Sequence, residues 1–255
     1  MKTLAALLAG AFALTAAELK PRTAQAFDDY IRKTEQRLDA REAFLWCDQS
    51  PDRMSRARAG EVSVEPTGAQ AEIKVADGLI HDWVGCAFIP GATLESTLTM
   101  VQNYNHHKDV YQPEVIDSRL LSRSGDDFKV YLRLLKKKVI TVVLDTEHDV
   151  RYFAVDAHRA RSRSYTTKVA EVENAGKSNE HALPPGTGHG FLWKLDSYWR
   201  FQERDGGVYI ECQAVSLTRD VPAGLGWLID PIIRNLPRES LANTLRATRS
   251  ALAKP

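Results

Sequence analysis

The chain has 255 residues, 44% of them hydrophobic and 26% charged, which are ordinary values for a globular protein of one large domain or two small ones. Its 34 Lys and Arg residues against 33 Asp and Glu residues give a net charge of +1, so no bulk attraction for nucleic acid is expected. Beyond the N-terminal segment no run of about eighteen apolar residues occurs, which excludes an internal transmembrane helix.

The N-terminal segment predicts a secretory signal peptide over residues 1–17. Lys2 precedes the apolar run T-L-A-A-L-L-A-G-A-F-A-L-T-A-A, which ends in small residues. Cleavage could follow Ala17 or Ala26. We favour Ala17, because cleavage after Ala26 would remove the first turn of a helix that follows. An uncleaved anchor helix is the alternative, and the signal peptide predicts an exported protein, periplasmic or secreted.

Residues 18–54 are predicted to form an N-terminal helix and a connection. The helix is expected over residues 21–41, with Pro21 in its first turn. One face of that helix carries the apolar and small side chains at helical spacing, which are Phe27, Tyr30, Ile31, Thr34 and Leu38. A polar, arginine-rich connection follows, and a single domain is expected over residues 55–255.

The predicted domain begins with patterns typical of strands. Residues 61–65 and 71–75 alternate in polarity around Pro66-Thr67-Gly68, which predicts a hairpin. Residues 79–89 are apolar and predict a buried strand, and residues 93–105 predict a helix capped by Thr93.

Antiparallel strands and two C-terminal helices account for the remaining chain. Short turns join the strands, which favours a meander. We expect the strands near residues 114–123, 127–136, 138–146, 150–158, 162–174, 189–204 and 207–219. The helices are expected over residues 223–234 and 237–253.

This order of elements resembles the helix-grip fold of the START-like (SRPBCC) superfamily, as an exported, bacterial-type member. The resemblance covers about residues 55–253 and is carried by P-G-A-T-L-E-S-T-L from Pro90 and by S-Y-W-R-F-Q-E-R-D-G-G-V-Y-I-E from Ser197, followed by the last helix. It implies an α+β fold in which a curved antiparallel sheet wraps around a long C-terminal helix. It also implies a cavity for a lipid, a quinone or a polyketide-like compound. The signal peptide and the added N-terminal helix depart from the smaller members.

Late aromatic residues, charged residues inside strands and the last helices supply the candidate ligand-binding residues. A charged side chain on an inward face must be paired or solvated, and in a cavity it could orient a ligand. Alternation puts Trp199 and Phe201 on one face of their strand and Tyr198 on the other, without telling which face meets the helix. The candidates are Arg133, Arg161, Trp193, Tyr198, Trp199, Glu211, Trp227, Ile232, Leu241 and Leu245.

The cysteines and histidines carry weaker signals. Cys47, Cys86 and Cys212 are odd in number, so at least one thiol is unpaired or pairs between chains, and Cys212 is expected in the core. His106 and His107 are adjacent and would point apart on a helix, so we predict a solvated helix end and no metal site. No cofactor and no catalytic residue is predicted.

Two other functions stay open at this stage. An enzyme resembling the cyclase or hydrolase members would need polar groups converging in the cavity, for instance Glu211 with Arg161 or Tyr198. An envelope accessory domain would bind another protein through an exposed apolar patch. Lys136-Lys137-Lys138 is predicted to be a solvent-facing turn, which could make transient contact with an anionic membrane surface.

Overall fold

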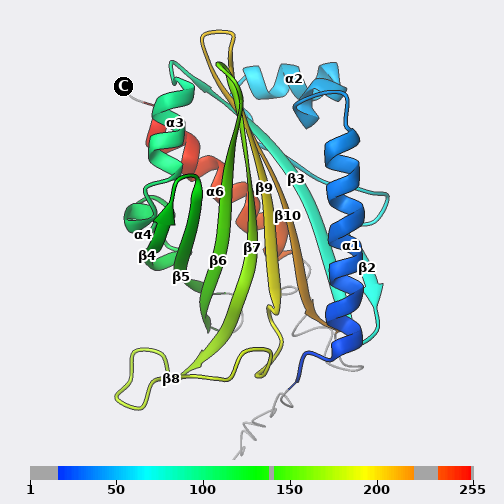
Figure 1. The fold of residues 1–255 in the computed structure, drawn as a ribbon, viewed down its shortest axis with the longest axis vertical. Coiled ribbons are helices and arrows are strands. Elements are labelled where there is room, and N and C mark those ends of the chain that lie inside the picture. The colour runs from blue at the N-terminus through cyan, green and yellow to red at the C-terminus, as the bar shows by residue number, and fades with distance from the viewer. Residues whose placement is uncertain (1–16, 138–140, 221–234, 254–255) are drawn as a thin grey trace, which may run out of the picture.

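The computed structural model describes residues 17–137, 141–220 and 235–253. A ten-stranded antiparallel sheet forms the centre, and helices lie on both of its faces (Figure 1). The strand order is β1-β3-β10-β9-β7-β6-β5-β4, with β2 beside β3 and β8 beside β7. The strands are β1 (Ser63–Pro66), β2 (Glu72–Val75), β3 (Gly78–Pro90), β4 (Val115–Ser124), β5 (Asp127–Lys137), β6 (Thr141–Asp156), β7 (Arg159–Glu173), β8 (His181–Ala182), β9 (Lys194–Arg204) and β10 (Gly207–Arg219).

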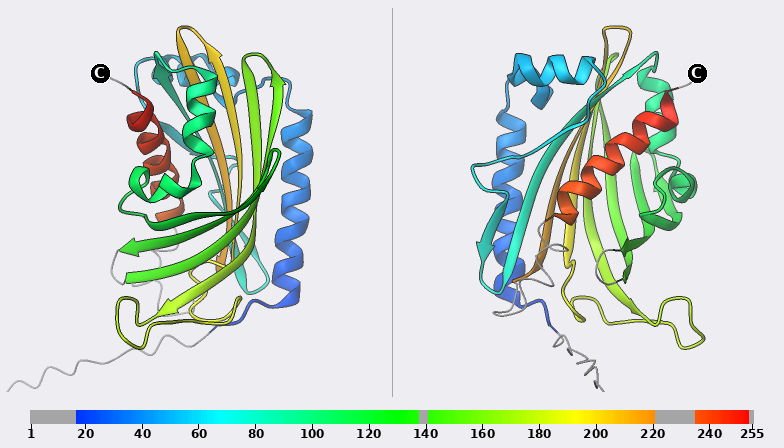
Figure 2. Two further views of the ribbon diagram at one scale, coloured as in Figure 1. Left: turned by 60° about the vertical axis from the view of Figure 1, so that its left-hand side comes forward. Right: turned by 180° about the vertical axis from the view of Figure 1, so that it is seen from behind.

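The C-terminal helix α6 (Leu236–Leu252) crosses one face of the curved sheet, which we call the inner face (Figure 2). The short helices α3 (Leu94–Val101) and α4 (His107–Val110), with the 3-10 turn η2 (Tyr104–His106), lie on the same side. Leu241 and Leu245 of α6 are buried there in one apolar cluster with Phe201 and Ile210 of the sheet.

The N-terminal helix α1 (Pro21–Ala40) covers the opposite, outer face (Figures 1 and 2). Its Phe27, Ile31 and Leu38 are buried against Val215 and Leu217 of β10. The 3-10 turn η1 (Trp46–Gln49) and α2 (Pro51–Arg58) continue along this side. The helical spacing of these apolar residues therefore fits their burial, and the 21–41 helix is found where the sequence predicts it.

Side-chain alternation along β10 assigns each residue to one of the two layers. Ile210 and Cys212 belong to the cluster beneath α6, whereas Tyr209 packs with the η1 segment and Val215 packs with α1. Successive strand residues point to opposite faces. Because both faces are covered, β10 is buried almost throughout.

The predicted fold class is confirmed: the chain is α+β, with a long antiparallel sheet and the C-terminal helix packed on it. The predicted 61–65/71–75 hairpin is wrong, because β1 and β2 pair with different parts of β3 and not with each other. The strand predicted to end at residue 146 and the one predicted from residue 150 are the single strand β6.

Other predicted boundaries also move. The connection after α1 contains α2, which begins at Pro51 with the Ser50 side chain as its cap. The helix predicted over 223–234 and nearly all of the signal peptide lie outside the described residues. Within the described part of the chain, no helix combines the length and apolar character needed to cross a bilayer.

Candidate functional site

A cavity of about 550 Å³ lies between the inner face of the sheet and α6. Its apolar walls come from β5, β6, β9 and α6 and from tyrosines on the short helical segments. Tyr104 and Tyr152 meet inside the cavity, their hydroxyl oxygens 2.9 Å apart. The apolar lining includes Val130, Leu132, Leu134, Leu144, Val150, Trp199, Phe201, Leu241 and Ala247.

Small side chains on the central strands leave the room for this cavity. Ser164 of β7 pairs with Ser197 of β9, which in turn pairs with Ala214 of β10. Ser162 and Ser216 extend this row along the same face, and all five residues line the cavity. A larger residue at these positions would extend into the space that α6 leaves open, because facing side chains normally interdigitate to fill such a gap.

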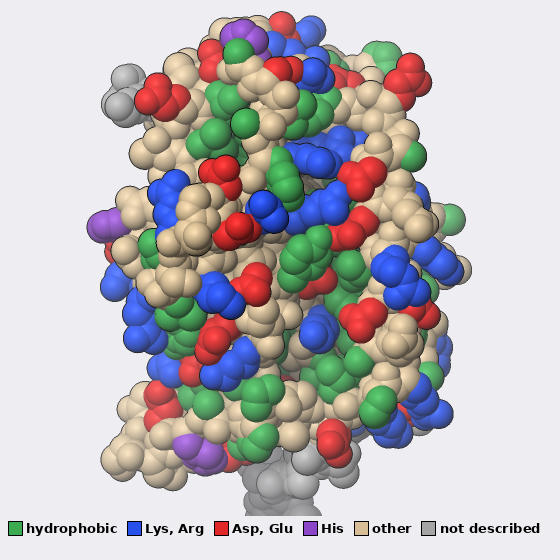
Figure 3. Space-filling view, in the orientation of Figure 1, with side chains coloured by type: hydrophobic (Ala, Val, Ile, Leu, Met, Phe, Trp, Pro, Cys, Tyr) green, Lys and Arg blue, Asp and Glu red, His purple; other side chains and the backbone are tan. Residues whose placement is uncertain are grey.

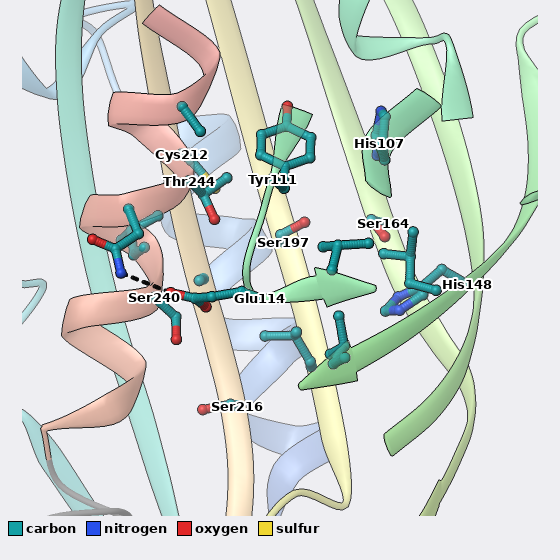
Figure 4. A pocket seen from close by; sticks show the side chains of 18 of the residues that line it. His107, Tyr111, Glu114, His148, Ser164, Ser197, Cys212, Ser216, Ser240 and Thr244 are labelled. Carbon is teal, nitrogen blue, oxygen red and sulfur yellow. Dashed lines mark hydrogen bonds between the residues drawn. The ribbon is translucent and has the colours of Figure 1, made fainter. Parts of the chain in front are cut away.

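The hydroxyl groups of the serine row line the cavity. Within the described ranges, the hydroxyls of Ser162, Ser164, Ser197 and Ser216 make no hydrogen bond to another residue. Ser162 is 3% exposed and Ser216 is 6% exposed, so these groups are shielded from bulk water. Figure 4 shows Ser164, Ser197 and Ser216 along the sheet side of the cavity. Because most buried polar groups in proteins have a hydrogen-bond partner, these hydroxyls are available to a molecule in the cavity.

His148 of β6 adds a neutral imidazole to the cavity wall. Its Nε2 lies 3.0 Å from Thr146 Oγ1, and that hydroxyl donates its proton to the Leu132 carbonyl at 3.0 Å. The Thr146 oxygen must therefore accept from Nε2–H, which leaves Nδ1 with a lone pair. Burial lowers the pKa of His148 to about 4, so the ring is neutral at pH 7.

The prediction that His106 and His107 form a solvated helix end is wrong for His107. Its ring is buried between Tyr104 and Tyr111, with centroids 4.6 and 5.0 Å away, and it lines the cavity. Nε2–H donates to the Val101 carbonyl at 3.0 Å, and burial lowers the pKa of His107 to about 4. His106 is the exposed member of the pair, 3.0 Å from Asp109. In the part of the chain that the structure describes, no cluster of three potential metal ligands occurs.

An ion pair between Lys136 and Glu114 lies where β4 and β5 approach α6. Lys136 Nζ donates to Glu114 and, at 2.7 Å, to Ser240 Oγ, and Asn243 Nδ2 donates to Glu114 Oε1 at 2.7 Å. Figure 4 shows Glu114 and Ser240 close together beside α6. Burial acts to raise the pKa of Glu114, but Lys136 outweighs it and the net shift is downward. The solvent-facing role predicted for Lys136 is thus wrong, since both charges are matched inside the site. Arg246 also lines the cavity, but its side chain is exposed and bonded to Asn243.

The structure places two of the predicted ligand-binding residues, Trp199 and Leu241, in the cavity lining. Leu245 is fully buried beneath the cavity, in the cluster that holds α6 on the sheet. Trp227 and Ile232 lie outside the described residues.

The other five predicted residues lie on the outer face and not in the cavity. Arg133 pairs with Asp145 at 2.7 Å, and Trp193 packs in the cluster beneath α1. Three residues bond directly to the N-terminal segment: Arg161 to Asp39 at 3.0 Å, Tyr198 to Glu35 at 3.1 Å, and Glu211 to Arg41 at 2.7 Å. The predicted strand residues miss the cavity because successive residues of a strand point to opposite faces, so their neighbours in the strand line the cavity instead.

Alternation could also have revealed the missed residues. Ser197 shares its strand face with Trp199 and Phe201, and Ser216 shares its face with Cys212 and Ala214. Once one residue of β9 is assigned to the inner face, every second residue of the strand belongs to that face, and Ser197 is among them. His148 gives no such signal, because a lone histidine in a strand is as compatible with the surface as with a cavity.

No protein-family model matches the chain, and no curated protein matches it. Structural similarity is found to START/SRPBCC helix-grip proteins. A STAR-related lipid transfer protein from Xanthomonas axonopodis is 16% identical, with a TM-score of 0.49 over 72% of this chain and 98% of that one. The lipid transfer and protein localization domain of human StarD13 is 6% identical, with a TM-score of 0.45 over 83% and 98%.

An enzyme has the same kind of likeness. The Zhui aromatase/cyclase from Streptomyces sp. R1128 is 10% identical, with a TM-score of 0.39 over 68% of this chain and 93% of that one. Likeness at this level carries no conclusion about ligand or activity. The strand order and the position of α6 establish the fold.

Proposed function

We propose that the protein binds and carries an uncharged, hydrophobic small molecule between the sheet and α6. The observation that supports this is the unfilled space: a cavity of about 550 Å³ with largely apolar walls. That volume falls within the range of about 300–1,000 Å³ typical of small-molecule sites. A ligand that buries roughly 300 Å² of apolar surface there gains on the order of 7 kcal/mol, before the cost of association.

The polar groups of the wall narrow the class of ligand. A pure hydrocarbon would leave the buried Ser162 and Ser216 hydroxyls and His148 Nδ1 without partners, which costs about 1–3 kcal/mol for each buried group. A carboxylate or phosphate would need a cation inside the cavity. Of the two cations that line it among the described residues, Lys136 is engaged with Glu114, and Arg246 has an exposed side chain bonded to Asn243. An apolar molecule that carries hydroxyl groups satisfies both conditions, since a hydroxyl can donate to Nδ1 and pair with serine.

The direct test compares two ligands that differ only in the head group. Long-chain alcohol and fatty acid of the same chain length are titrated at pH 8 against the purified full chain, with displacement of Nile red as the signal. We expect the alcohol to bind at least about tenfold more tightly, a difference of about 1.4 kcal/mol. Tighter binding of the acid would contradict the uncharged class. Binding of neither ligand and no co-purifying apolar species in native mass spectrometry would contradict the carrier itself.

A cavity-filling variant locates the site. Ser197→Leu adds a side chain at the centre of the small-residue row, so Nile red binding should weaken by about tenfold or more while the fold persists. Ser178→Leu makes the same change at an exposed position and should bind the dye like the wild type. Unchanged binding by Ser197→Leu would place the ligand elsewhere.

The two alternative functions receive less support. The enzyme hypothesis relied on Glu211 with Arg161 or Tyr198, and these side chains bond to the N-terminal segment on the outer face. The accessory-domain hypothesis required an exposed apolar patch and no cavity, whereas a cavity is present. The large exposed apolar side chains among the described residues are Ile116, Leu121 and Val155.

We also propose that the protein is exported, on the strength of its N-terminal sequence. Cell fractionation of the native host, with N-terminal sequencing of the mature chain, tests export and the Ala17 cleavage site together.

Basic and acidic side chains are interspersed on the face that carries α1, without a broad area of one sign (Figure 3). Such a surface gives no reason to expect nucleic acid as a partner.

A further inference from the structure

Two of the three thiols meet on the outer face, away from the cavity. Cys47 of η1 and Cys86 of β3 are 39 positions apart in the chain, yet their sulfur atoms are 2.9 Å apart. Cys47 is 0% exposed and Cys86 is 1% exposed. Sulfur atoms in a disulfide are about 2 Å apart, so only about 1 Å of movement separates this contact from a bond.

We propose that Cys47 and Cys86 form a disulfide that fastens the N-terminal segment to the sheet. The two thiols lose two protons and two electrons, and one S–S bond forms. The electrons go to an oxidant of the disulfide class, either a thiol–disulfide oxidoreductase or oxidised glutathione, whose own disulfide is reduced to two thiols. Such oxidants act in the compartments to which exported proteins go.

The surroundings hold the two thiols in register. Glu211 is the strand partner of Cys86, and its carboxylate accepts hydrogen bonds from Arg41 and from the backbone N–H of Trp46. The residue directly before Cys47 is therefore fixed to the strand directly beside Cys86. A bond between the two sulfurs closes a contact that the backbone already positions, without carrying either element to a new place.

The third thiol is kept out of this pairing by the sheet. Cys212 of β10 pairs with Gly85, points to the inner face and lines the cavity. Cys86 is the next residue along β3 and points to the outer face, where it packs in the η1 cluster. Because the sheet lies between them, Cys212 cannot replace either partner without unfolding.

Burial sets the time at which the bond can form. The hydrogen bond to Cys47 and burial both raise the pKa of Cys86, so the folded chain holds little of the reactive thiolate. Oxidation is thus expected during folding, and a reductant should act on the bond only when the protein is unfolded.

The test counts thiols in the full chain. The protein is unfolded in urea with reductant, refolded in a mixture of reduced and oxidised glutathione, then acid-quenched, denatured and alkylated. We expect one alkylated cysteine, Cys212, a loss of two hydrogen atoms in the intact mass, and a linked peptide containing Cys47 and Cys86. Three alkylated cysteines, or a linkage that contains Cys212, would overturn the proposal.

The fastening role has its own measurement. The oxidised wild type should melt roughly 5–10 °C above the same protein refolded in its reduced form. The difference should vanish in the Cys47→Ala/Cys86→Ala double variant and persist in Cys212→Ala. Equal melting temperatures of the oxidised and reduced wild type would overturn the fastening role. Neither assay involves a ligand, so the outcome is independent of the proposed carrier function.

Discussion

Individual buried charges of this protein serve the attachment of its N-terminal segment. Arg200, 7% exposed, donates to the carbonyls of Leu38 and Phe44 at 2.6 and 2.7 Å. Burial, together with the neighbouring positive charge of Arg41, lowers the pKa of Arg200 to about 10. Glu211 holds the same segment from the next strand. Both charges lie in strands, where a sequence pattern cannot distinguish a ligand contact from a structural one.

Glu211→Ala should destabilise the fold without changing the ligand site. The substitution leaves Arg41, whose side chain is 11% exposed, without its buried partner. Removing one member of a buried pair costs about 3–5 kcal/mol, whereas removing a partly exposed one costs about 0–1. Urea unfolding of Glu211→Ala beside Arg161→Ala should show this contrast. Equal losses would refute the structural role of Glu211.

His148 should make stability depend on pH in mildly acidic solution. Its pKa is lowered to about 4 in the folded protein, from an ordinary value near 6.5. The unfolded chain therefore binds the proton more readily, and the stabilisation present above pH 6.5 is lost as the pH falls towards 4. At pH 4.5 the loss is about 2–3 kcal/mol from this residue.

His148→Asn isolates that contribution, since His107 and all other titrating groups stay in place. The free energy of unfolding, measured at pH 7 and pH 4.5, should fall less in the variant than in the wild type. An identical fall in both proteins would show that His148 is not held neutral by burial.

At the scale of elements, the approach of α6 to β3 depends on a single missing side chain. A Cβ atom placed on Gly85 would lie 2.5 Å from Leu245 Cδ1 and 3.0 Å from the Ser63 carbonyl oxygen. Leu245 is fully buried at this crossing. Glycine therefore lets the helix lie close to the strand, and the distance between the two sets the floor of the cavity.

Gly85→Ala should cost about 1–3 kcal/mol through overpacking, and Leu245→Ala about 2–5 kcal/mol through the space it leaves. Combined, the two changes should cost less than their sum, because the alanine methyl group occupies part of the vacated volume. A double-mutant cycle by thermal or urea unfolding gives the coupling. Simple additivity would mean that the two residues do not meet.

Local patterns predicted the elements well where a local cause decides them. The Phe27–Leu38 spacing marks α1, and Thr93 marks the start of α3, whose capping box is formed with Ser96. The hairpin failed because β1 and β2 each pair with β3, a choice made by long-range contacts. The prediction of the cavity-lining residues failed for a related reason. Alternation places Tyr198 and Trp199 on opposite faces of the strand, but only the packing of the helices decides which face is the inner one.

At the scale of the whole molecule, the N-terminal segment belongs to the core and not to an appendage. Without α1, the buried Trp193, Val215 and Leu217 would face water. The helix predicted within residues 18–54 and the domain predicted over residues 55–255 therefore pack against each other.

A chain that starts at residue 55 should accordingly fail to accumulate as a soluble, cooperatively folded protein. The loss of α1 exposes a continuous apolar sheet face, which favours aggregation. A chain that starts at residue 18 keeps every described contact of α1 and should fold like the full protein. Size-exclusion chromatography and thermal unfolding of both chains decide the matter. A stable monomer from residue 55 would show that residues 55–255 fold without α1.

The alternation along β10 lets substitutions on its two faces change two different properties of the protein. Cys212, Ala214 and Ser216 line the cavity, whereas Tyr209 and Glu211 contact the N-terminal segment and Gln213 bonds to Asp82 of β3 on the same outer face. Under the proposed function, variants at the even positions should differ in the apolar molecule they bind, at a nearly constant melting temperature. Variants at the odd positions should show the reverse: different melting temperatures and unchanged ligand binding.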